Sequence, residues 1–555
     1  MVRAPRRRFT YSGRAHEAAD GATLLAALAA DGVPTLGRST RYHRPRAPFC
    51  GIGQCAGCLV RVNGRPGVRS CRHVVADGDR VESEAGWPSA RFDVFAVLDA
   101  LFPGGIDTLH GFRRPAFAVP LYQRIVRRLA GYGRPPDPGS ERGIAAPPLR
   151  VDAEVAVVGG GRSGRAAAAR LVALGARPTL LDRDPSGPDL PGVDRHRGVS
   201  VTYLPPPAAG GERPFTLLGF SEPACGVLVR ARRVVVAVGG YDASLLFDGN
   251  DRPGVQSADG ALALAAALGH APFRRGVVVG GGARARAVLE ALGPSVGAVV
   301  APGEIRPEVV RLASDLGIPL YPRSLVLGTR GRGRVRALAL RARGTGAGFS
   351  VDGDAVVLAH RRLPNAQLFF QAGAKMAWGG GTGAYYPVAD AAGATSVPGL
   401  FAVGEAAGVA EPFAAESGER AADAIAGTAS GPLEPLEGVA RPGPAELEGY
   451  YRELLAARPR GRWIACACED VRLDELLDGS SAGYRGIEVL KRYSSLGTGL
   501  CQGRYCVPDA LLVLSLLEGR PPSEVGYLTQ RPPVHPTPLA ALAALSGALS
   551  EDPRP

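Results

Sequence analysis

The apolar pattern of the chain predicts a series of short α/β elements. Near the N-terminus, RRRFTY is read as a first strand, and apolar residues recur at helical spacing in GATLLAALAADGV at 21–33. The segment LVRVNGRPGVRSC at 59–71 carries Asn63-Gly64 between two apolar runs, which predicts a β-hairpin with a two-residue turn. Further along, PDALLVLSLLEG at 508–519 is apolar enough to be helical.

The middle of the chain shows the strand-turn-helix-strand pattern twice. Residues 153–183, AEVAVVGGGRSGRAAAARLVALGARPTLLDR, form the first copy. Residues 276–304, which begin with GVVVGGGARARAVLEALG, form the second. No run approaches the roughly 18 apolar residues that a membrane span requires, so we expect no membrane span and a cytoplasmic protein.

Composition and charge exclude few functions here. The formal charge is +13, but the basic residues are scattered arginines with only two lysines, Lys375 and Lys491. This pattern favours a G+C-rich coding sequence over an anionic partner, and we expect no nucleic-acid binding because no basic-aromatic surface or known module is present. With 555 residues, the chain is long enough for three to five domains.

Eight of the nine cysteines fall into two groups. In the first group, Cys50, Cys55, Cys58 and Cys71, the opening gaps match the plant-type ferredoxin spacing around a 2Fe-2S cluster. The hairpin would return Cys71 to the cysteine loop. Strand, helix, cysteine loop and hairpin together predict a β-grasp ferredoxin-like domain; structural zinc and a disulfide are the alternatives.

The second group consists of Cys466, Cys468, Cys501 and Cys506. Residues two apart face the same way only in an extended segment, so CAC at 466–468 should lie in a loop. The spacing resembles the helical 2Fe-2S domain of bacterioferritin-associated ferredoxin, with zinc as the alternative. Cys225 is expected to be a plain buried thiol.

The first dinucleotide motif has its glycines and its acid where nucleotide binding requires them. Gly159, Gly161 and Gly164 complete GxGxxG, and Asp182 ends the second strand, where a carboxylate accepts hydrogen bonds from an adenosine ribose. Downstream, TSVPGLFAVGEAAG resembles the segment that closes a flavin site, with Glu405 in place of the usual Asp. The predicted cofactor-binding residues are therefore Gly159, Gly161, Gly164, Asp182, Gly239, Gly404 and Glu405.

The second dinucleotide motif is weaker. It keeps Gly280 and Gly282, but Ala285 takes the third position and Ala301 stands where the acid should be. This half is expected to keep the fold with weak or no binding of NAD. No Ser-His-Asp set, histidine-rich metal site or acid/base pair appears, so no catalytic residue is assigned in this chain.

Several stretches together resemble the alpha subunit of heterotetrameric sarcosine oxidase and its relatives, the opine oxidases, hydrogen cyanide synthase and dye-linked proline dehydrogenases. They are GRSTRYHRPR, WPSARFDVFAVLDALFP, IVRRLAGYG, NDRPGV, IEVLKRYSSLGTG with CQGR, and SEVGYLTQRPPVHPTPLAALA. Sarcosine oxidase alpha subunits continue into a folate-binding domain and have largely lost the cysteines. This chain departs from them in both respects, since it stops after the RPPVHP region and keeps both cysteine groups. We therefore expect an iron-sulfur dehydrogenase that does not pass a one-carbon unit to folate.

The resemblance implies a partner and further cofactors. Substrate would be oxidised on a beta subunit of amino-acid-oxidase type, FMN would lie between the subunits, and a quinone or an electron-transfer protein would accept the electrons. Lys491, Arg492 and the N–H groups near Gln502 and Gly503, if these open a helix, would suit an FMN phosphate; a solvated basic loop is the alternative.

The prediction is an α/β chain with a Rossmann-like, two-dinucleotide-binding-domain flavoprotein core, flanked by the β-grasp domain and a small helical 2Fe-2S domain. Its function would be that of an FAD and iron-sulfur electron-transfer subunit of an oxidoreductase acting on CH–NH donors; the alternative is a self-contained NAD(P)H-dependent reductase. The expected parts are the ferredoxin-like domain 1–95, a connector 96–150, the flavin domain 151–270 and 346–430, the inserted lobe 271–345, a linker 431–462, the second cluster domain 463–520 and a tail 521–555.

Overall fold

The computed structural model describes residues 6–102, 117, 119–121, 136–140, 147–184, 186–210, 212–221, 225–380, 383–428, 444–456 and 462–550. Most of the expected connector 96–150 and linker 431–462 lies outside these residues. The chain forms two compact units, which we describe separately. The first unit comprises Met1–Ser140, Asp242–Arg361 and Ala445–Leu528, and the second comprises Glu141–Tyr241, Arg362–Pro444 and Thr529–Pro555.

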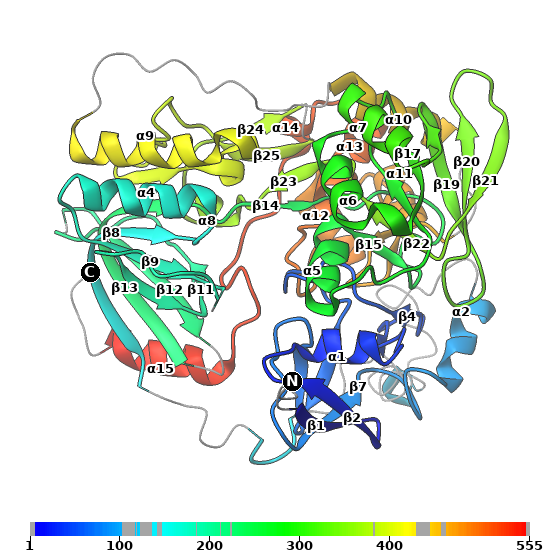
Figure 1. Cartoon of the computed structure of the whole chain (residues 1–555), viewed down its shortest axis with the longest axis horizontal. Helices are drawn as coiled ribbons and strands as arrows, with labels where there is room; N and C mark the ends of the chain where they lie inside the picture. Colours follow the sequence, from blue (N-terminus) through cyan, green and yellow to red (C-terminus); the bar gives the residue numbers. More distant parts are fainter. Residues whose placement is uncertain are drawn as a thin grey trace. The chain divides into compact units, whose positions relative to one another are not determined.

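The N-terminal part of the first unit is a five-stranded sheet covered by one helix, α1 (Leu24–Ala30) (Figure 1). Along the sheet the strands run β2 (Arg14–Ala19), β1 (Arg6–Tyr11), β7 (Asp79–Ser83), β5 (Leu59–Val62) and β6 (Arg65–Arg69). Thr23 caps α1 by accepting a hydrogen bond from the Ala26 N–H at 3.3 Å. The predicted hairpin is confirmed: Asn63 and Gly64, between β5 and β6, have φ values of 50° and 81°.

A five-stranded parallel sheet forms the inserted part of the first unit. Its order is β15 (Val255–Ser257), β22 (Ala355–Leu358), β16 (Gly276–Val279), β17 (Val296–Val300) and β18 (Leu320–Tyr321). Helices α5 (Ala258–Leu268), α6 (Ala283–Leu292) and α7 (Pro307–Asp315) accompany it. The strands β16 and β22 are buried along their whole length, as expected for a parallel sheet that is covered on both faces. A three-stranded antiparallel sheet follows, made of β19 (Ser324–Arg330), β20 (Ala337–Ala342) and β21 (Gly348–Asp352).

The C-terminal part of the first unit is mainly helical. It contains β27 (Ile464–Cys466), β28 (Val471–Arg472), α10 (Pro444–Ala456), α11 (Leu473–Ser481), α12 (Ile487–Ser494), α13 (Val507–Glu518) and α14 (Pro522–Val525). A buried ion pair links it to the end of the parallel sheet, because Arg361 bonds to Asp509 of α13 and both side chains are only 2% exposed. The Ser244 hydroxyl donates to the same carboxylate at 2.9 Å. A charge pair this deeply buried depends on both of its partners.

The second unit is built on a seven-stranded sheet. Its order is β10 (Asp194–Arg197), β9 (Pro178–Asp182), β8 (Leu149–Val158), β13 (Cys225–Val236), β12 (Phe215–Ser221) and β11 (Val199–Tyr203), with β26 (Leu400–Ala402) also paired to β13. Helices α4 (Arg162–Ala173) and α9 (Ala414–Ala426) cover one face, and α15 (Leu539–Ser550) packs on the other (Figure 1). The remaining elements include β14 (Gly240–Asp242), β23 (Arg362–Pro364), α8 (Gln367–Gln371), β24 (Met376–Gly379) and β25 (Ala384–Pro387). Among the described residues, no helix has the length and apolar character needed to cross a membrane.

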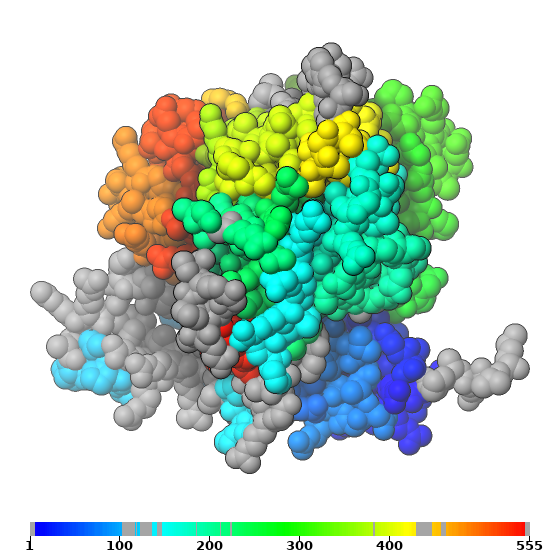
Figure 2. Space-filling model, turned by 90° about the vertical axis from the view of Figure 1, so that its left-hand side faces the viewer, coloured from blue at the N-terminus to red at the C-terminus, as the bar shows by residue number. Residues whose placement is uncertain are grey.

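Small residues let α4 and α9 approach closely, and the two helices adjoin in the space-filling view (Figure 2). A Cβ atom on Gly418 of α9 would lie 2.1 Å from the Ser163 carbonyl oxygen and 3.0 Å from the Ala167 nitrogen. No side chain can be added at Gly418 unless the helices separate.

We predict that Gly418→Ala destabilises the second unit by about 1–3 kcal/mol, since it overpacks the α4–α9 contact. Gly547→Ala is the matched control, because Gly547 lies in α15 with no atom within 4 Å of an added Cβ. That control should be neutral or gain up to about 1 kcal/mol from helix propensity. Hydrogen exchange of the α4 and α9 amides reports the stability of this contact in each variant. Equal protection of these amides in the two variants would contradict the prediction.

Candidate functional site

The four cysteines of the first group meet in the ferredoxin-like part of the first unit. Cys50, Cys55 and Cys58 lie on the loop between β4 (Pro45–Arg46) and β5, and Cys71 follows β6. All four side chains are buried, with exposed fractions of 1–6%. The hairpin therefore returns the fourth cysteine to the other three, as the sequence predicts.

Backbone N–H groups surround the sulfur of Cys50. The N–H groups of Gln54 and Cys55 each lie 3.3 Å from the Cys50 Sγ. Burial by itself would raise the pKa of the Cys50 thiol, but the Cys55 thiol and the backbone N–H groups of Ile52, Gln54 and Cys55 lower it to about 6. This loop thus stabilises a thiolate, the form in which cysteine binds metal.

The four thiols of the first group associate in two pairs. Cys50 hydrogen bonds with Cys55, and Cys58 hydrogen bonds with Cys71. The hydrogen bond with Cys50 is the main cause that raises the pKa of Cys55, and the bond with Cys58 does the same for Cys71. A 2Fe-2S cluster takes two ligands on each iron, so paired thiols suit it. Among the described His, Cys, Asp and Glu residues, no group of three or more is placed to hold a single metal ion.

The second group of cysteines gathers at one end of the helical part. Cys466 ends β27 and Cys468 lies in the following turn, while Cys501 and Cys506 lie in turns just before α13. Cys468 is half-buried and the other three are buried. Cys468 lies in a turn as predicted, whereas Cys466 is the last residue of the strand β27. The four thiols form one series, in which Cys501 bonds with both Cys468 and Cys506, and Cys506 also bonds with Cys466.

Arg504 adds a buried positive charge beside these thiols. It is 1% exposed, and its Nη1 donates to the Cys501 carbonyl oxygen at 3.1 Å. Hydrogen bonds from Cys468 and Cys506, followed by the Tyr505 backbone and the Arg504 charge, hold the pKa of Cys501 well below its usual value. The sequence analysis missed Arg504. Its position between two predicted ligands was the available signal.

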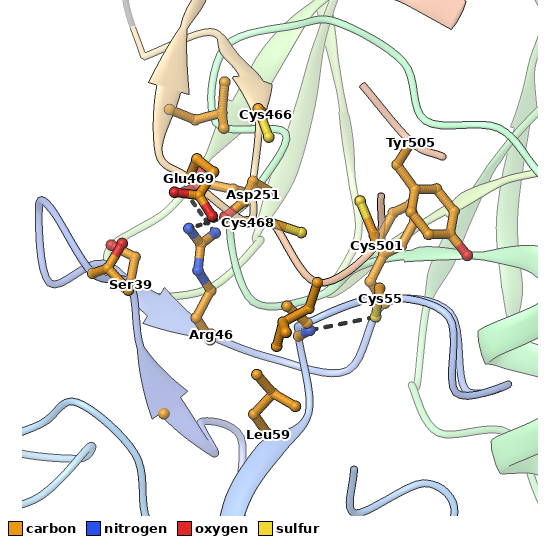
Figure 3. Close-up of a pocket in the computed structure, with 18 of the residues that line it drawn as sticks. Ser39, Arg46, Cys55, Leu59, Asp251, Cys466, Cys468, Glu469, Cys501 and Tyr505 are labelled. Carbon is orange, nitrogen blue, oxygen red and sulfur yellow. Dashed lines mark hydrogen bonds and ion pairs between the residues drawn. The ribbon is translucent and has the colours of Figure 1, made fainter. Parts of the chain in front are cut away.

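A cavity of about 370 Å³ lies within the first unit and borders both cysteine groups (Figure 3). Cys55 lines it from the first group, and Cys466, Cys468, Cys501 and Cys506 all line it from the second. The second group therefore surrounds free space that a cluster can fill. The two groups, far apart in sequence, share one cavity.

Arg46 clamps the second group from the ferredoxin-like side. Its guanidinium donates to the carbonyl oxygen of Ala467, the residue between Cys466 and Cys468. It also bonds to the Asp470 carboxylate, whose side chain is 0% exposed, and lies 3.6 Å from Asp251. Sequence reasoning missed this residue too, because nothing near Arg46 in the chain indicates a partner more than 400 residues away.

Helix α5 of the parallel sheet supports the first cysteine loop from another side. The Ser257 N–H donates to the Phe49 carbonyl oxygen at 3.0 Å. A Cβ on Gly260 would lie 2.2 Å from that same oxygen, so only glycine permits the approach. Cys50 is thus held between the hairpin and this helix.

In the second unit, the turn between β8 and α4 forms an open cradle lined by glycines. A Cβ on Gly164 would lie 1.9 Å from the Gly159 carbonyl oxygen, which explains the third glycine of the motif. Gly161 caps α4 without a side chain, and an added Cβ there would meet no atom within 4 Å. The helix N-terminus is therefore open toward an anion, as nucleotide binding requires.

Asp182 lies beside this cradle, at the end of β9. A Cβ on Gly160 would lie 2.1 Å from its carboxylate oxygen. The carboxylate accepts a bond from Arg195 at 3.1 Å and one from the Asp184 N–H at 3.1 Å. A carboxylate has about four acceptor positions, so Asp182 retains capacity for a ribose hydroxyl.

Glu405 lies close to the glycines that follow β13. Its carboxylate accepts from the Gly240 N–H at 3.2 Å and pairs with Arg362 at 2.7 Å. A Cβ on Gly239 would lie 3.9 Å from the same carboxylate, and Gly404 directly precedes Glu405 in the chain. Glu405 is therefore positioned by Arg362, a partner that the sequence analysis did not identify.

The inserted lobe differs from the first motif at the position of its acid. Ala301 is buried at 1% exposed and offers no carboxylate. Arg284, in the first turn of α6, is paired with Asp242 at 2.8 Å and also with Asp259. These two acids next to the helix N-terminus disfavour a pyrophosphate there, since like charges repel.

Cys225 differs from its prediction in part. It is half-buried rather than buried, because it begins β13 near the Pro147 carbonyl oxygen, 3.6 Å from its sulfur. It belongs to neither cysteine group.

We predict that Arg46→Ala weakens the packing of residues 464–472 by up to about 3–5 kcal/mol, because it removes the guanidinium that bonds directly to the buried Asp470 carboxylate. Arg6→Ala is the control: that arginine is 68% exposed in its pair with Glu17, and its loss should cost less than about 1 kcal/mol. Hydrogen exchange of the β27 amides gives the opening free energy. If hydrogen exchange of the β27 amides is unchanged in Arg46→Ala, Arg46 does not hold this segment in place.

Comparison with known families supports this description. Residues 6–86 match the 2Fe-2S iron-sulfur cluster binding domain, residues 225–427 match the pyridine nucleotide-disulphide oxidoreductase family, and residues 460–546 match the sarcosine oxidase A3 domain. The chain therefore carries a 2Fe-2S domain and an oxidoreductase domain of the FAD-binding kind.

Three curated relatives cover different shares of the chain. The sarcosine oxidase alpha subunit of Rhizobium meliloti is 28% identical over 96% of this chain, which spans 57% of that relative's length. An opine oxidase subunit of Agrobacterium tumefaciens is 27% identical over 71% of this chain and 92% of its own. The HcnA subunit of hydrogen cyanide synthase from Pseudomonas aeruginosa is 43% identical over 15% of this chain and 74% of its own.

The fold also matches a solved structure. L-proline dehydrogenase from P. horikoshii superposes with a TM-score of 0.67 over 97% of this chain and 98% of that chain, at 20% sequence identity. With the cysteine groups, the glycine cradle and the three domain matches, the comparisons place the chain in one family. The chain belongs to the family that includes the sarcosine oxidase alpha subunits, their opine oxidase counterparts and hydrogen cyanide synthase.

Proposed function

We propose that this chain is the FAD and iron-sulfur electron-transfer subunit, of alpha type, of a heteromeric oxidoreductase acting on CH–NH donors. The substrate, an amine or amino acid of the sarcosine, opine or proline kind, is oxidised on a partner flavoprotein of amino-acid-oxidase type. This chain then passes single electrons to a quinone or an electron-transfer protein. The relatives named above are subunits of sarcosine oxidase, opine oxidase and hydrogen cyanide synthase.

The observation that carries the proposal is the pair of buried cysteine groups around one cavity of the first unit. The thiols of the first group associate in two pairs, and those of the second form one hydrogen-bonded series, so each group offers four sulfurs close enough together for a 2Fe-2S cluster. Two such centres in one chain serve one-electron chemistry and add nothing to hydride transfer.

The eight proposed ligands are Cys50, Cys55, Cys58, Cys71, Cys466, Cys468, Cys501 and Cys506. A bound 2Fe-2S cluster supplies reversible gain and loss of one electron. The N–H groups around Cys50 favour its thiolate, and the hydrogen bonds from Cys468 and Cys506, with the charge of Arg504, favour that of Cys501. The first group is buried, as are Cys466, Cys501 and Cys506 of the second, and burial protects these sulfurs from oxidation.

For the flavin, the proposed binding residues are Gly159, Gly161, Gly164, Asp182, Gly239, Gly404 and Glu405. The α4 N-terminus would receive the pyrophosphate, and Asp182 would accept the ribose hydroxyls. The Arg362–Glu405 pair orients the Glu405 carboxylate toward the Gly240 N–H.

The predicted FMN phosphate position does not fit the structure. Lys491 is paired with Glu488 at 2.7 Å and, like Arg492, lies in the last turn of α12, whose carbonyl end repels an anion. Gln502 and Gly503 do not open a helix, because α13 begins only at Val507 and the Gln502 N–H already donates to the Gly499 carbonyl oxygen. We derive no step through FMN at these residues.

The rival function, a self-contained NAD(P)H-dependent reductase, has less support. The inserted lobe offers a buried Ala301 in place of the ribose acid and two carboxylates near the α6 N-terminus. Fast bleaching of the bound flavin by NADH in a stopped-flow experiment would favour the rival over our proposal.

Anaerobically purified protein should contain about four iron and about four sulfide ions per chain, since each 2Fe-2S cluster holds two of each. Cys58→Ser and Cys468→Ser should each remove about half of the iron, because a cluster needs its four thiolates. Cys225→Ser is the matched control and should retain all of it. Zinc in place of iron, or amine oxidation by the chain without a partner, would refute the proposal.

We predict that Gly161→Ala folds normally but loses the tightly bound adenine-containing flavin, because its new methyl group points only into the space assigned to the pyrophosphate. Gly164→Ala is a contrasting variant that should damage the fold itself, since its Cβ would lie 1.9 Å from a carbonyl oxygen. Flavin content and circular dichroism distinguish the two. Full flavin occupancy in Gly161→Ala would exclude the cradle as the binding site.

A further inference from the structure

One side chain joins the two cysteine groups. Tyr505 and Gln54 are 451 positions apart, yet the Tyr505 hydroxyl lies 3.5 Å from the Gln54 Oε1. The Tyr505 ring also packs edge-on against Phe49, with ring centroids 5.2 Å apart and an interplanar angle of 87°. All three residues belong to the first unit.

The residues on both sides of these contacts are close neighbours of the cysteines. Phe49 precedes Cys50, and the Gln54 N–H lies 3.3 Å from the Cys50 Sγ. On the other side, Tyr505 precedes Cys506, and its backbone N–H bonds to the sulfur of Cys501. A continuous series of bonds and short contacts therefore runs from the Cys501 sulfur through Tyr505 and Gln54 to the Cys50 sulfur.

The surroundings hold this contact in one arrangement. The Ser244 hydroxyl has one proton to donate, and both the Tyr505 carbonyl oxygen and the Asp509 carboxylate lie within hydrogen-bonding distance of it. Arg46 holds the Cys466–Cys468 segment against the ferredoxin-like part, as described above. Figure 3 shows Cys55 and Cys501 at the cavity that both groups line, with Tyr505 next to Cys501.

We propose that Tyr505 is the bridge over which the two cysteine-bound clusters exchange electrons directly within one chain. With one cluster held by each cysteine group, the reduced cluster would lose one electron and the oxidised cluster would gain it; no bond would form or break, no proton would move, and Tyr505 itself would be neither oxidised nor reduced. The inference rests on the proposed function, because it requires a cluster at each group.

The alternative is that the two clusters work separately, each with its own external partner. In that case the Tyr505 contacts would be packing only, and their removal would alter stability without altering an electron-transfer rate. A rate measurement therefore separates a bridge from a structural contact.

The first experiment tests proximity in the intact chain. Iron and sulfide analysis establishes whether both clusters are present, and electron paramagnetic resonance of the fully dithionite-reduced protein then follows. We expect the two signals to be split or broadened by spin-spin interaction, which disappears in Cys58→Ser with one cluster left. Two clusters whose spectra simply add would overturn the bridge while leaving the proposed function intact; a lack of iron would instead refute the proposed function.

The second experiment tests Tyr505. Photoexcited deazaflavin delivers one electron to the oxidised chain, and visible and circular dichroism changes follow its redistribution between the clusters. Tyr505→Leu should slow the redistribution, and Tyr505→Phe, which keeps the ring but loses the Gln54 contact, should have a smaller effect. Tyr484→Leu, at a 39% exposed tyrosine stacked on Tyr493 in the same helical part, is the control.

Both Tyr505 variants are compared only after iron analysis shows full loading. If Tyr505→Leu does not bind its full complement of iron, Tyr505→Phe and Gln54→Leu carry the test. Both variants keep the aromatic ring at position 505 and all eight cysteines of the two groups. The assignment would be overturned if electrons redistribute as fast as in the Tyr484→Leu control in every fully loaded variant of Tyr505 and Gln54.

Discussion

Arg46 donates to the Ala467 carbonyl oxygen and to the buried Asp470 carboxylate, and the organisation of the first unit depends on this contact. A buried carboxylate is costly unless a cation compensates it, so the two parts of the chain that carry Arg46 and Asp470 stabilise each other. Arg41 strengthens the same connection through bonds to the Asp470 carbonyl oxygen and to Glu475. The cysteines on either side are thereby brought to a common cavity.

In the same unit, glycines allow the cysteines to be both buried and closely approached by neighbouring backbone. Sulfur ligands must be shielded from water, but a redox centre also needs a short path to its partner. Glycine allows both: Gly260 lets α5 approach the Phe49 carbonyl oxygen, and a Cβ added to Gly51 would lie only 3.0 Å from the Gly260 Cα. Backbone N–H groups then replace water as donors to the thiolates.

The second unit uses glycine for a different purpose. Gly164 and Gly418 allow α4 to approach the β8 turn and α9, whereas Gly161 leaves space at the helix N-terminus. The close packing of α4 therefore fixes the position of its N-terminus, where Gly161 leaves open space. The inserted lobe repeats the topology, but Asp242 and Asp259 pair there with Arg284 in the first turn of α6. A shared fold does not by itself preserve a shared ligand.

The sequence by itself was sufficient for features that depend on local spacing. The Asn63-Gly64 hairpin, helix α13 and the turn position of Cys468 follow from backbone preferences over a few residues, and the structure confirms them. The FMN phosphate site at Gln502 depended on a helix that opens there, and α13 instead begins at Val507.

Only the tertiary structure decided which residues meet across long sequence separations. Arg46 with Asp470, Arg361 with Asp509, Arg362 with Glu405 and Tyr505 with Gln54 have no local pattern that announces them. These buried charges and ring edges meet only because whole helices and strands pack together, and the residue pattern along the chain does not indicate which elements pack against each other. The cysteine spacing thus predicted each group separately, but their common cavity exists only in the folded unit.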